Sequence, residues 1–314
     1  MSACSRIFAA LAAWAAAAAL AAPDAATLDY RLSARAVAPG VYVVEGANED
    51  FSRANGCNII NTGFIVGDDG VLVVNTGPSR RYGEQLRALV AKTTPRPVKQ
   101  VLHLNLHPDY FLGNQAFADV PRLATAATRR GMQAEAKAYE DNLYRLCGDW
   151  MKGTEALLPD REIAAGPVAL AGRRLELREL GGHTDSDLVL VDRDSGVVFA
   201  GGLVFVDRIP TTPHARLADW QRSLDALAGQ PYQVLVPSHG PVVRDARGVD
   251  QTRRYLQWLD RSFSAAAQRG LDLVEVMALP VPPEFRAWAA FATEYPRNVV
   301  HLYPGYEART LQRP

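Results

Sequence analysis

Three of the six histidines stand where an apolar, strand-like segment ends in a loop. His107 follows QVLHLNL, His183 lies in LGGHTDSD, and His239 lies in VLVPSHGPV. Asp109 comes two residues after His107, and glycines flank the other two histidines. Loops that follow strands can bring distant residues together on a rigid sheet. Imidazole and carboxylate groups gathered in this way suit a divalent transition metal, above all zinc.

The other three histidines are not expected to be ligands. His103 and His107 are four residues apart. They would lie roughly 13 Å apart on an extended strand, too far for two bonds of about 2 Å to one ion. We therefore expect His103 to be a buried strand residue. His214 and His301 do not follow a predicted strand.

The histidines must be positioned by strands and helices that the hydrophobic pattern predicts. Alternating or β-branched segments predict strands at 41–46, 98–104, 173–180, 187–201 and 232–242, and a hairpin at 58–79 around a Gly-Asp-Asp-Gly turn. Helical spacing of apolar residues, or helix-favouring composition, predicts helices at 80–93, 124–151, 218–229 and 247–278. The strands come in two groups, each followed by helices, which indicates an α/β fold with helices outside the sheets.

The N-terminus reads as an export signal. Residues 7–21 carry no charge, Arg6 precedes them, and Ala19-Leu20-Ala21 fits a small-x-small cleavage site. We expect residues 1–21 to be a secretory signal peptide, which would place the mature protein in the periplasm; an uncleaved anchor is the alternative. No other segment is apolar enough to cross a bilayer, so no stable membrane span is expected after cleavage.

Cleavage at that site would remove Cys4 and leave two cysteines, Cys57 and Cys147. An even number of cysteines in an oxidising compartment predicts a disulfide, and two unrelated thiols are the alternative. Lysine and arginine together number 34, as do aspartate and glutamate, and no stretch concentrates the basic residues. A nucleic-acid partner is therefore not expected.

Several short motifs resemble those of the metallo-β-lactamase superfamily in order and spacing. They are Asn75-Thr76-Gly77, the loop 107–114, Gly182-His183-Thr184, and the segments 199–201 and 238–240. Within that superfamily, HTDSDLVLVD, LVFVDRIP, DWQRSLDAL and YPRNVVHLY resemble the quinoprotein relay system zinc metallohydrolases. Those are exported bacterial proteins associated with pyrroloquinoline-quinone-dependent dehydrogenases, so a periplasmic quinoprotein is an implied partner. A small molecule is the expected substrate.

The resemblance implies a four-layer αβ/βα sandwich with the site at one edge, between the two sheets. It implies one metallo-β-lactamase-like domain over residues 22–314. The core is expected at about 38–245, and a C-terminal helical extension at 246–314.

The chain departs from the superfamily pattern at four polar positions. The family loop reads His-x-His-x-Asp-His, whereas this chain has Asn105 and Tyr110 in place of the first and last histidines. Asn75 stands where an aspartate is usual, and Gly202 stands where a bridging aspartate or cysteine is usual. The resemblance leaves four candidate metal ligands: His107, Asp109, His183 and His239. One zinc ion is therefore expected rather than two, and a site without metal remains open.

Two functions follow from these residues. The first is a zinc hydrolase, in which Asp109 orients or deprotonates water and Tyr110 or Asn105 donates a hydrogen bond to the oxyanion. Packing is an alternative role for Tyr110. The second function is a non-catalytic relative that keeps the fold and binds a small molecule or a partner. The sequence does not identify the substrate.

Overall fold

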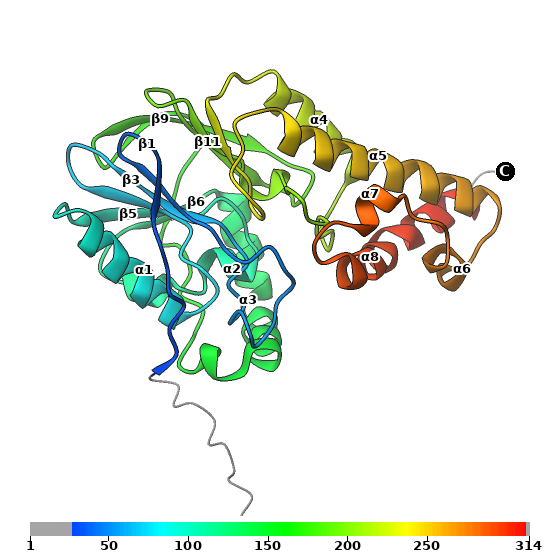
Figure 1. Ribbon diagram of the computed structural model, residues 1–314, viewed down its shortest axis with the longest axis horizontal. Coiled ribbons are helices and arrows are strands. Elements are labelled where there is room, and N and C mark those ends of the chain that lie inside the picture. Colours follow the sequence, from blue (N-terminus) through cyan, green and yellow to red (C-terminus); the bar gives the residue numbers. More distant parts are fainter. Residues whose placement is uncertain (1–26, 312–314) are drawn as a thin grey trace, which may run out of the picture.

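Two β-sheets packed face to face form the centre of the molecule, seen in a computed structural model that describes residues 27–311 (Figure 1). The expected signal peptide, residues 1–21, lies outside this range. No helix within the described range is long and apolar enough to cross a membrane.

The first sheet contains seven strands within the described residues, in the order β1-β2-β3-β4-β5-β6-β7. Neighbours from β1 to β4 pair antiparallel, and neighbours from β4 to β7 pair parallel. The strands are β1 (Arg35–Ala38), β2 (Val41–Val44), β3 (Thr62–Val66), β4 (Val71–Val74), β5 (Val98–Leu102), β6 (Arg122–Ala124) and β7 (Arg161–Glu162). The candidate ligand loop begins directly after β5.

The second sheet contains five strands of the described chain, in the order β12-β11-β10-β9-β8. The pair β11 and β12 is parallel and the other neighbours are antiparallel. The strands are β8 (Gly166–Leu170), β9 (Arg173–Leu180), β10 (Asp187–Asp192), β11 (Val197–Phe199) and β12 (Val234–Val236). His183 lies between β9 and β10, and His239 follows β12.

Helices cover the outer face of each sheet, which completes the four layers expected from the sequence. On the first sheet lies α1 (Arg80–Thr93), whose Tyr82, Leu86 and Val90 pack against the strands. On the second lie α4 (Leu217–Ala228) and α5 (Arg247–Gln268). Two further helices, α2 (Pro108–Phe111) and α3 (Ala126–Cys147), border the first sheet near the candidate ligand loop. Short 3₁₀ helices occupy Asn114–Phe117, Gly148–Met151 and Gly201–Leu203.

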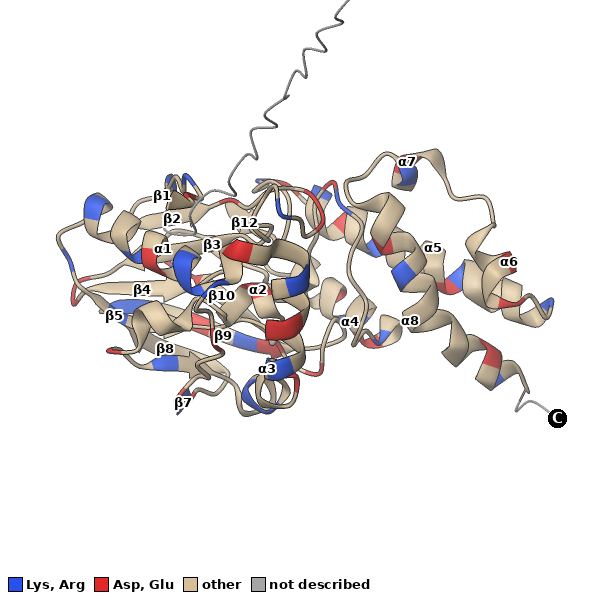
Figure 2. Cartoon of the chain, turned by 90° about the horizontal axis from the view of Figure 1, so that it is seen from below, with Lys and Arg blue, Asp and Glu red and all other residues tan. Residues whose placement is uncertain are grey.

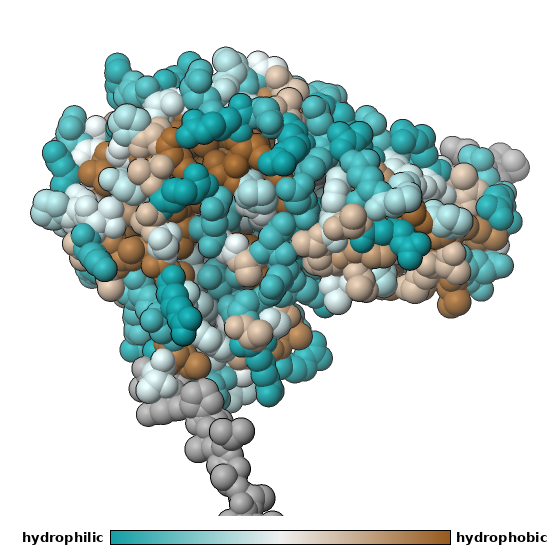
Figure 3. Space-filling model, in the orientation of Figure 1, coloured by the Kyte–Doolittle hydropathy of each residue, from teal (hydrophilic) through white to brown (hydrophobic). Residues whose placement is uncertain are grey.

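The C-terminal helices form an extension that stands out from the side of the sandwich (Figures 1 and 3). It contains α6 (Leu273–Met277), α7 (Pro283–Arg286) and α8 (Phe291–Leu311), which fold back along α5. Buried aromatic side chains, among them Tyr255, Phe263 and Tyr303, join α8 to α5. In the view of Figure 3, apolar residues gather on the lower side of this extension. The boundary at 246 stays a prediction.

Two predicted helices are shorter than expected. In the segment 124–151, Ala124 is the last residue of β6, and Thr125 caps α3 by accepting a hydrogen bond from the Thr128 amide. The last four residues of the segment form a 3₁₀ helix. The segment 247–278 divides into α5 and α6, because Gly270 has a φ of +69° that an α-helix does not tolerate.

The predicted disulfide between Cys57 and Cys147 is present and joins the β2–β3 loop to the end of α3. In the cartoon of Figure 2, lysine and arginine positions are interspersed with aspartate and glutamate positions along the helices and strands. This distribution agrees with the absence of a basic stretch in the sequence.

Candidate functional site

A pocket of about 280 Å³ lies at the edge of the sandwich where loops from both sheets meet α3. Three of the four candidate ligands line it: His107, Asp109 and His239. The remaining lining residues are Phe51, Ile59, Pro108, Glu135, Tyr139, Asn142, Thr211, Pro213 and His214. The pocket thus combines imidazole and carboxylate groups with apolar walls.

Asp109 is a buried carboxylate without a hydrogen-bond partner at one oxygen. Asp109 lies in the first turn of the short helix α2 and is 2% exposed. Its Oδ2 atom has no hydrogen-bond partner. Burial raises the pKa of Asp109 to about 7, although Arg208 opposes this shift. At neutral pH the carboxyl group can therefore both accept and release a proton.

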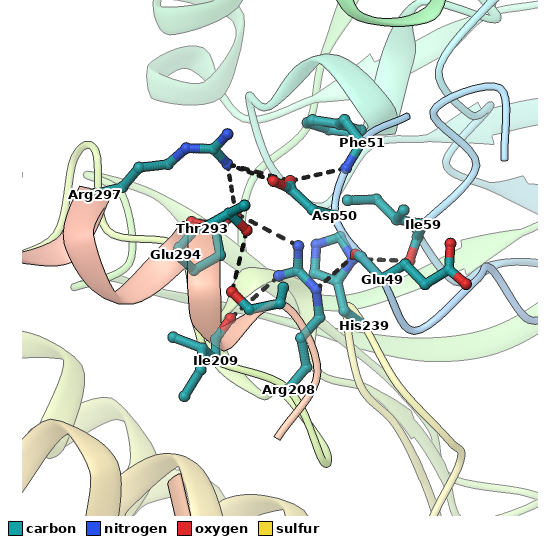
Figure 4. Close-up of polar contacts among 12 residues, drawn as sticks. Glu49, Asp50, Phe51, Ile59, Arg208, Ile209, His239, Thr293, Glu294 and Arg297 are labelled. Atoms are coloured by element: carbon teal, nitrogen blue, oxygen red, sulfur yellow. Dashed lines mark hydrogen bonds and ion pairs between the residues drawn. The ribbon is translucent and has the colours of Figure 1, made fainter. Parts of the chain in front are cut away.

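His239 presents one ring nitrogen to Asp109. Its Nδ1 lies 2.8 Å from the Ile59 carbonyl and must donate to it, which leaves the lone pair on Nε2 (Figure 4). Nε2 lies 3.7 Å from Asp109 Oδ2. The loop is fixed because Asn61 donates to the carbonyls of Pro237 and Gly240. Burial, with Arg208 second, holds the pKa of His239 well below its usual value, so the ring is neutral.

Arg208 is a fully buried guanidinium that the sequence analysis did not identify. It lies beside His239 in Figure 4 and is 0% exposed. Its Nε donates to the Glu49 carbonyl at 3.0 Å, and its Nη2 lies 3.6 Å from a carboxylate oxygen of Glu294 in α8. Burial lowers the pKa of Arg208, and Glu294 opposes this shift. The sequence offered no signal for it, because its counter-ion lies in the extension.

His183 is buried behind the pocket and does not line it. Its Nδ1 lies 3.2 Å from Asp187 Oδ1, and its Nε2 lies 3.4 Å from the Thr211 hydroxyl. A side chain at Gly202 would overlap with His183 Nδ1. The imidazole therefore occupies the space that a bridging residue at position 202 would need.

Asn105 and Tyr110, the other two proposed catalytic residues, also lie outside the pocket lining. The Asn105 amide donates to Asp187 at 2.5 Å, and its oxygen accepts from the His107 backbone at 3.0 Å. Tyr110 packs in the core between the sheets, its hydroxyl has no hydrogen-bond partner, and burial raises its pKa. Asn105 thus braces the ligand loop and Tyr110 fills the core. His103 is fully buried, as expected.

His214 is brought to His107, which the sequence did not predict. His107 Nε2 and His214 Nδ1 lie 3.2 Å apart, and both rings line the pocket. His214 comes from the loop between Gly201–Leu203 and α4, which contains no regular strand. Its position therefore depends on contacts that a search for strand ends does not reveal. His301 lies in α8 and does not line the pocket.

The donors form two pairs in one pocket, His107 with His214 and Asp109 with His239. Within residues 27–311, no three histidine, cysteine, aspartate or glutamate side chains are arranged as a ready-made metal cage. A two-ion centre does not fit, because Gly202 has no side chain to bridge two ions and the Asn105 amide donates to Asp187. A single ion fits the chemistry of the pocket, since the unpartnered Asp109 oxygen and the lone pair of His239 are suitable donors.

Comparisons with known proteins agree with this architecture. The chain is 22% identical to a linear primary-alkylsulfatase from Pseudomonas sp. (strain ATCC 19151), over 77% of this chain and 55% of that protein. The chain thus spans about half the length of this relative. Similar structures include a metallo-beta-lactamase from Pontibacter korlensis (TM-score 0.59, 22% identity, 72% of this chain and 99% of that one). Another, from Hirschia baltica, has a TM-score of 0.55 and 18% identity over 72% of this chain and 97% of that one.

The family of the chain is assigned from a sequence profile, because structural similarity at this level of identity shows the fold alone. The profile of the metallo-beta-lactamase superfamily matches residues 55–239, which is more than half of the chain. This match spans the strands and loops that carry His107, Asp109, His183 and His239. The chain belongs to the metallo-beta-lactamase superfamily.

Proposed function

We propose that the protein is an exported hydrolase that works at this pocket with one divalent ion, expected to be zinc. The observation that carries the proposal is the unpartnered Asp109 carboxylate facing His239 Nε2. His107, Asp109 and His239 would hold the ion. When bound, such an ion supplies a Lewis acid and lowers the pKa of bound water toward neutrality.

The pocket residues have separable roles in this hydrolysis. Asp109 has two carboxylate oxygens, so that one can hold the ion while the other accepts a proton from the attacking water. The hydrogen bond from His239 to Ile59 keeps the lone pair of Nε2 directed toward Asp109. Asn105 holds the His107 backbone, and Arg208 provides a positive charge behind His239. Neither of these two residues contacts the substrate, so both are positioning residues.

The walls of the pocket favour a substrate with an apolar portion. Phe51, Ile59, Tyr139 and Pro213 supply apolar surface beside the imidazoles. Such walls exclude water and orient the apolar part of a ligand. The superfamily relatives include an alkylsulfatase, which makes sulfate esters with an apolar chain the first class to screen.

Export and a quinoprotein partner are further parts of the proposal. The Cys57–Cys147 disulfide supports folding in an oxidising compartment such as the periplasm. The quinoprotein link rests on the sequence resemblance. We would test it by co-purification of the tagged protein from a periplasmic extract, with the Asp109→Asn variant as a control.

The test of function is turnover by the full chain with its metal content measured. Alkyl sulfates, carboxylic esters, thioesters, lactams and quinone precursors form the screen. Replacing Asp109→Asn is expected to lower kcat/KM at least 100-fold with the best substrate, because the proton acceptor is lost. The matched control is Asp119→Asn, a carboxylate that pairs with Arg87 at the surface. Equal activity in Asp109→Asn and wild type would contradict the hydrolase assignment.

Binding without turnover is the second candidate function. It is favoured by Asn105, which stands in place of a histidine ligand and donates its amide to Asp187, so that the superfamily's first metal site lacks one ligand. A ligand from the screen that saturates the pocket, measured by calorimetry, but is never converted would support this function over the first.

A further inference from the structure

We infer that His214 takes the place of His183 as a metal ligand, so that one divalent cation is held by His107, His214, Asp109 and His239. The inference rests on the single-ion part of the proposed function. It assigns a site that combines two superfamily loops with a loop held by the C-terminal extension.

His183 does not line the pocket, and its Nε2, the nitrogen available to a metal, faces a hydroxyl group. Both of its ring nitrogens have protein partners, Asp187 at Nδ1 and Thr211 at Nε2. Thr184 strengthens this arrangement, because its backbone amide donates to the other Asp187 oxygen at 2.9 Å. The ring also fills the space beside Gly202. Binding a metal through Nε2 would cost His183 its contact with the Thr211 hydroxyl, whereas the contact between Nδ1 and Asp187 could remain.

Two imidazole nitrogens in the pocket have the spacing of ligands that share one ion. Two nitrogens bound to one tetrahedral zinc ion at about 2.0–2.1 Å lie about 3.3 Å apart. His107 Nε2 and His214 Nδ1 lie 3.2 Å apart without any ion. Two facing nitrogens at this distance share either a proton or a cation.

The Asp109 carboxylate in the same pocket also lacks a partner. Asp109 Oδ2 is buried and has no hydrogen-bond partner, although it lines the pocket with both histidines. A buried carboxylate oxygen without a partner is costly unless something binds it. A cation shared with the imidazoles satisfies it. Since the donors stand as two pairs, binding would require side-chain movement to bring them onto one ion.

Contacts with α8 hold the loop that carries His214 in place. Asn298 of α8 donates to the Pro210 carbonyl at 2.9 Å and accepts from the Thr212 hydroxyl at 2.8 Å, and both contacts are buried. Tyr255 of α5 contacts the Asn298 amide at 2.9 Å. The loop is also fixed at its far end, where the Arg216 amide donates to the Gly182 carbonyl. Asn298 lies outside the family match, which ends at residue 239. The extension thus positions the new ligand.

The test measures metal binding directly. Full-length protein is freed of metal with a chelator and titrated with Zn²⁺ by calorimetry and with Co²⁺ by visible absorption, which reports coordination geometry. His214→Ala is expected to weaken Zn²⁺ binding at least tenfold and to change the Co²⁺ spectrum. His183→Ala is expected to stay within about threefold of wild type, and His301→Ala, a histidine of α8 outside the pocket lining, is the matched control.

A second variant tests the positioning by α8 without removing a ligand. Thr212→Val deletes the hydroxyl that reaches Asn298 and is expected to weaken Zn²⁺ binding several-fold while the protein stays folded by circular dichroism. Loss of binding in His183→Ala with full binding in His214→Ala would overturn the inference in favour of the superfamily arrangement.

A wild-type protein that binds neither ion would also overturn the inference and show that His107 and His214 share only a proton. If such a protein still turned over a substrate and Asp109→Asn abolished that turnover, the hydrolase assignment would be retained without the metal. Failure of the inference is in this way distinguished from failure of the proposed function.

Discussion

Asp109 couples the stability of the metal-free protein to pH. Its folded pKa of about 7 lies above the ordinary value of 3.8 because burial disfavours the charged form. The stabilising contribution of the protonated group is complete below about pH 4 and is lost as the pH rises to about 7. A shift of this size corresponds to roughly 4 kcal/mol.

We therefore expect Asp109→Asn to become more stable relative to wild type between pH 4 and pH 8. Urea unfolding in the presence of chelator at several pH values measures this difference. Asp119→Asn is the control, because Arg87 lowers the pKa of Asp119 below 3.8, so that its stability difference from wild type should stay constant between pH 4 and pH 8. Parallel stability curves for wild type and Asp109→Asn would show that Asp109 does not titrate abnormally.

The His183 ring occupies the space that a side chain at position 202 would need, so it can lie there only because residue 202 is a glycine. We expect Gly202→Ala to destabilise the protein by about 2 kcal/mol, because the added carbon would overlap with His183 Nδ1 and crowd Asp187. Unfolding by urea gives the value. Gly229→Ala is the matched control, since its nearest atom would lie 3.7 Å away. A cost no larger than that of the control would show that His183 moves aside freely.

Motif spacing was sufficient to find His107, Asp109 and His239, which meet in one pocket. It was insufficient for His214 and Arg208. The partners of these two residues, Asn298 acting through the loop and Glu294 directly, lie more than 80 residues further along the chain. Such contacts have no local pattern. Spacing also placed Tyr110 among the catalytic residues, whereas its ring packs between the sheets.

At the scale of elements, prediction worked where the local pattern and the fold agreed. The amphipathic segment 80–93 is α1 and the alternating segment 173–180 is β9, each with the expected bounds. Ala124, taken as the first residue of a helix, is the last residue of β6, because its pairing with Glu162 of β7 makes it part of a strand. Boundaries set by tertiary contacts were therefore the ones that were missed.

The disulfide joins elements that are separated by 90 residues, and its effect on stability follows from that separation. We expect the double variant Cys57→Ser, Cys147→Ser to lose about 4 kcal/mol of unfolding free energy, because the unfolded chain regains the entropy of an open loop. Chemical unfolding under oxidising conditions measures the loss. Wild type in a reducing agent should lose a similar amount, and unchanged stability after reduction would contradict the expectation.

At the scale of the whole molecule, buried charges join the extension to the sandwich. Arg208 pairs with Glu294, and Arg297 bridges Glu294 to Asp50 (Figure 4). Asp50 belongs to the β2–β3 loop, whereas Glu294 and Arg297 belong to α8. The extension is thus tied to the loop whose next residue, Phe51, lines the pocket.

We expect Glu294→Leu to cost about 3 kcal/mol, because it leaves the Arg208 guanidinium buried without its counter-ion. The double variant Arg208→Met, Glu294→Leu is expected to be more stable than Glu294→Leu alone, since no buried charge remains unpaired. Urea unfolding of the two single variants and the double variant gives the coupling energy. A double variant as unstable as the sum of the single ones would argue against an energetic link between these residues.

The two hydrogen bonds between Asn298 and the segment 209–216 limit how this scaffold can be re-engineered. Grafting the segment 209–216 onto a lactamase that ends before α8 would transfer the imidazole without the amide that aims it. Combinatorial libraries confined to the residues that line the pocket would, for the same reason, leave out Asn298, which holds the segment in place. Productive changes in specificity are expected to come in pairs, one in the segment and one in the distant helix.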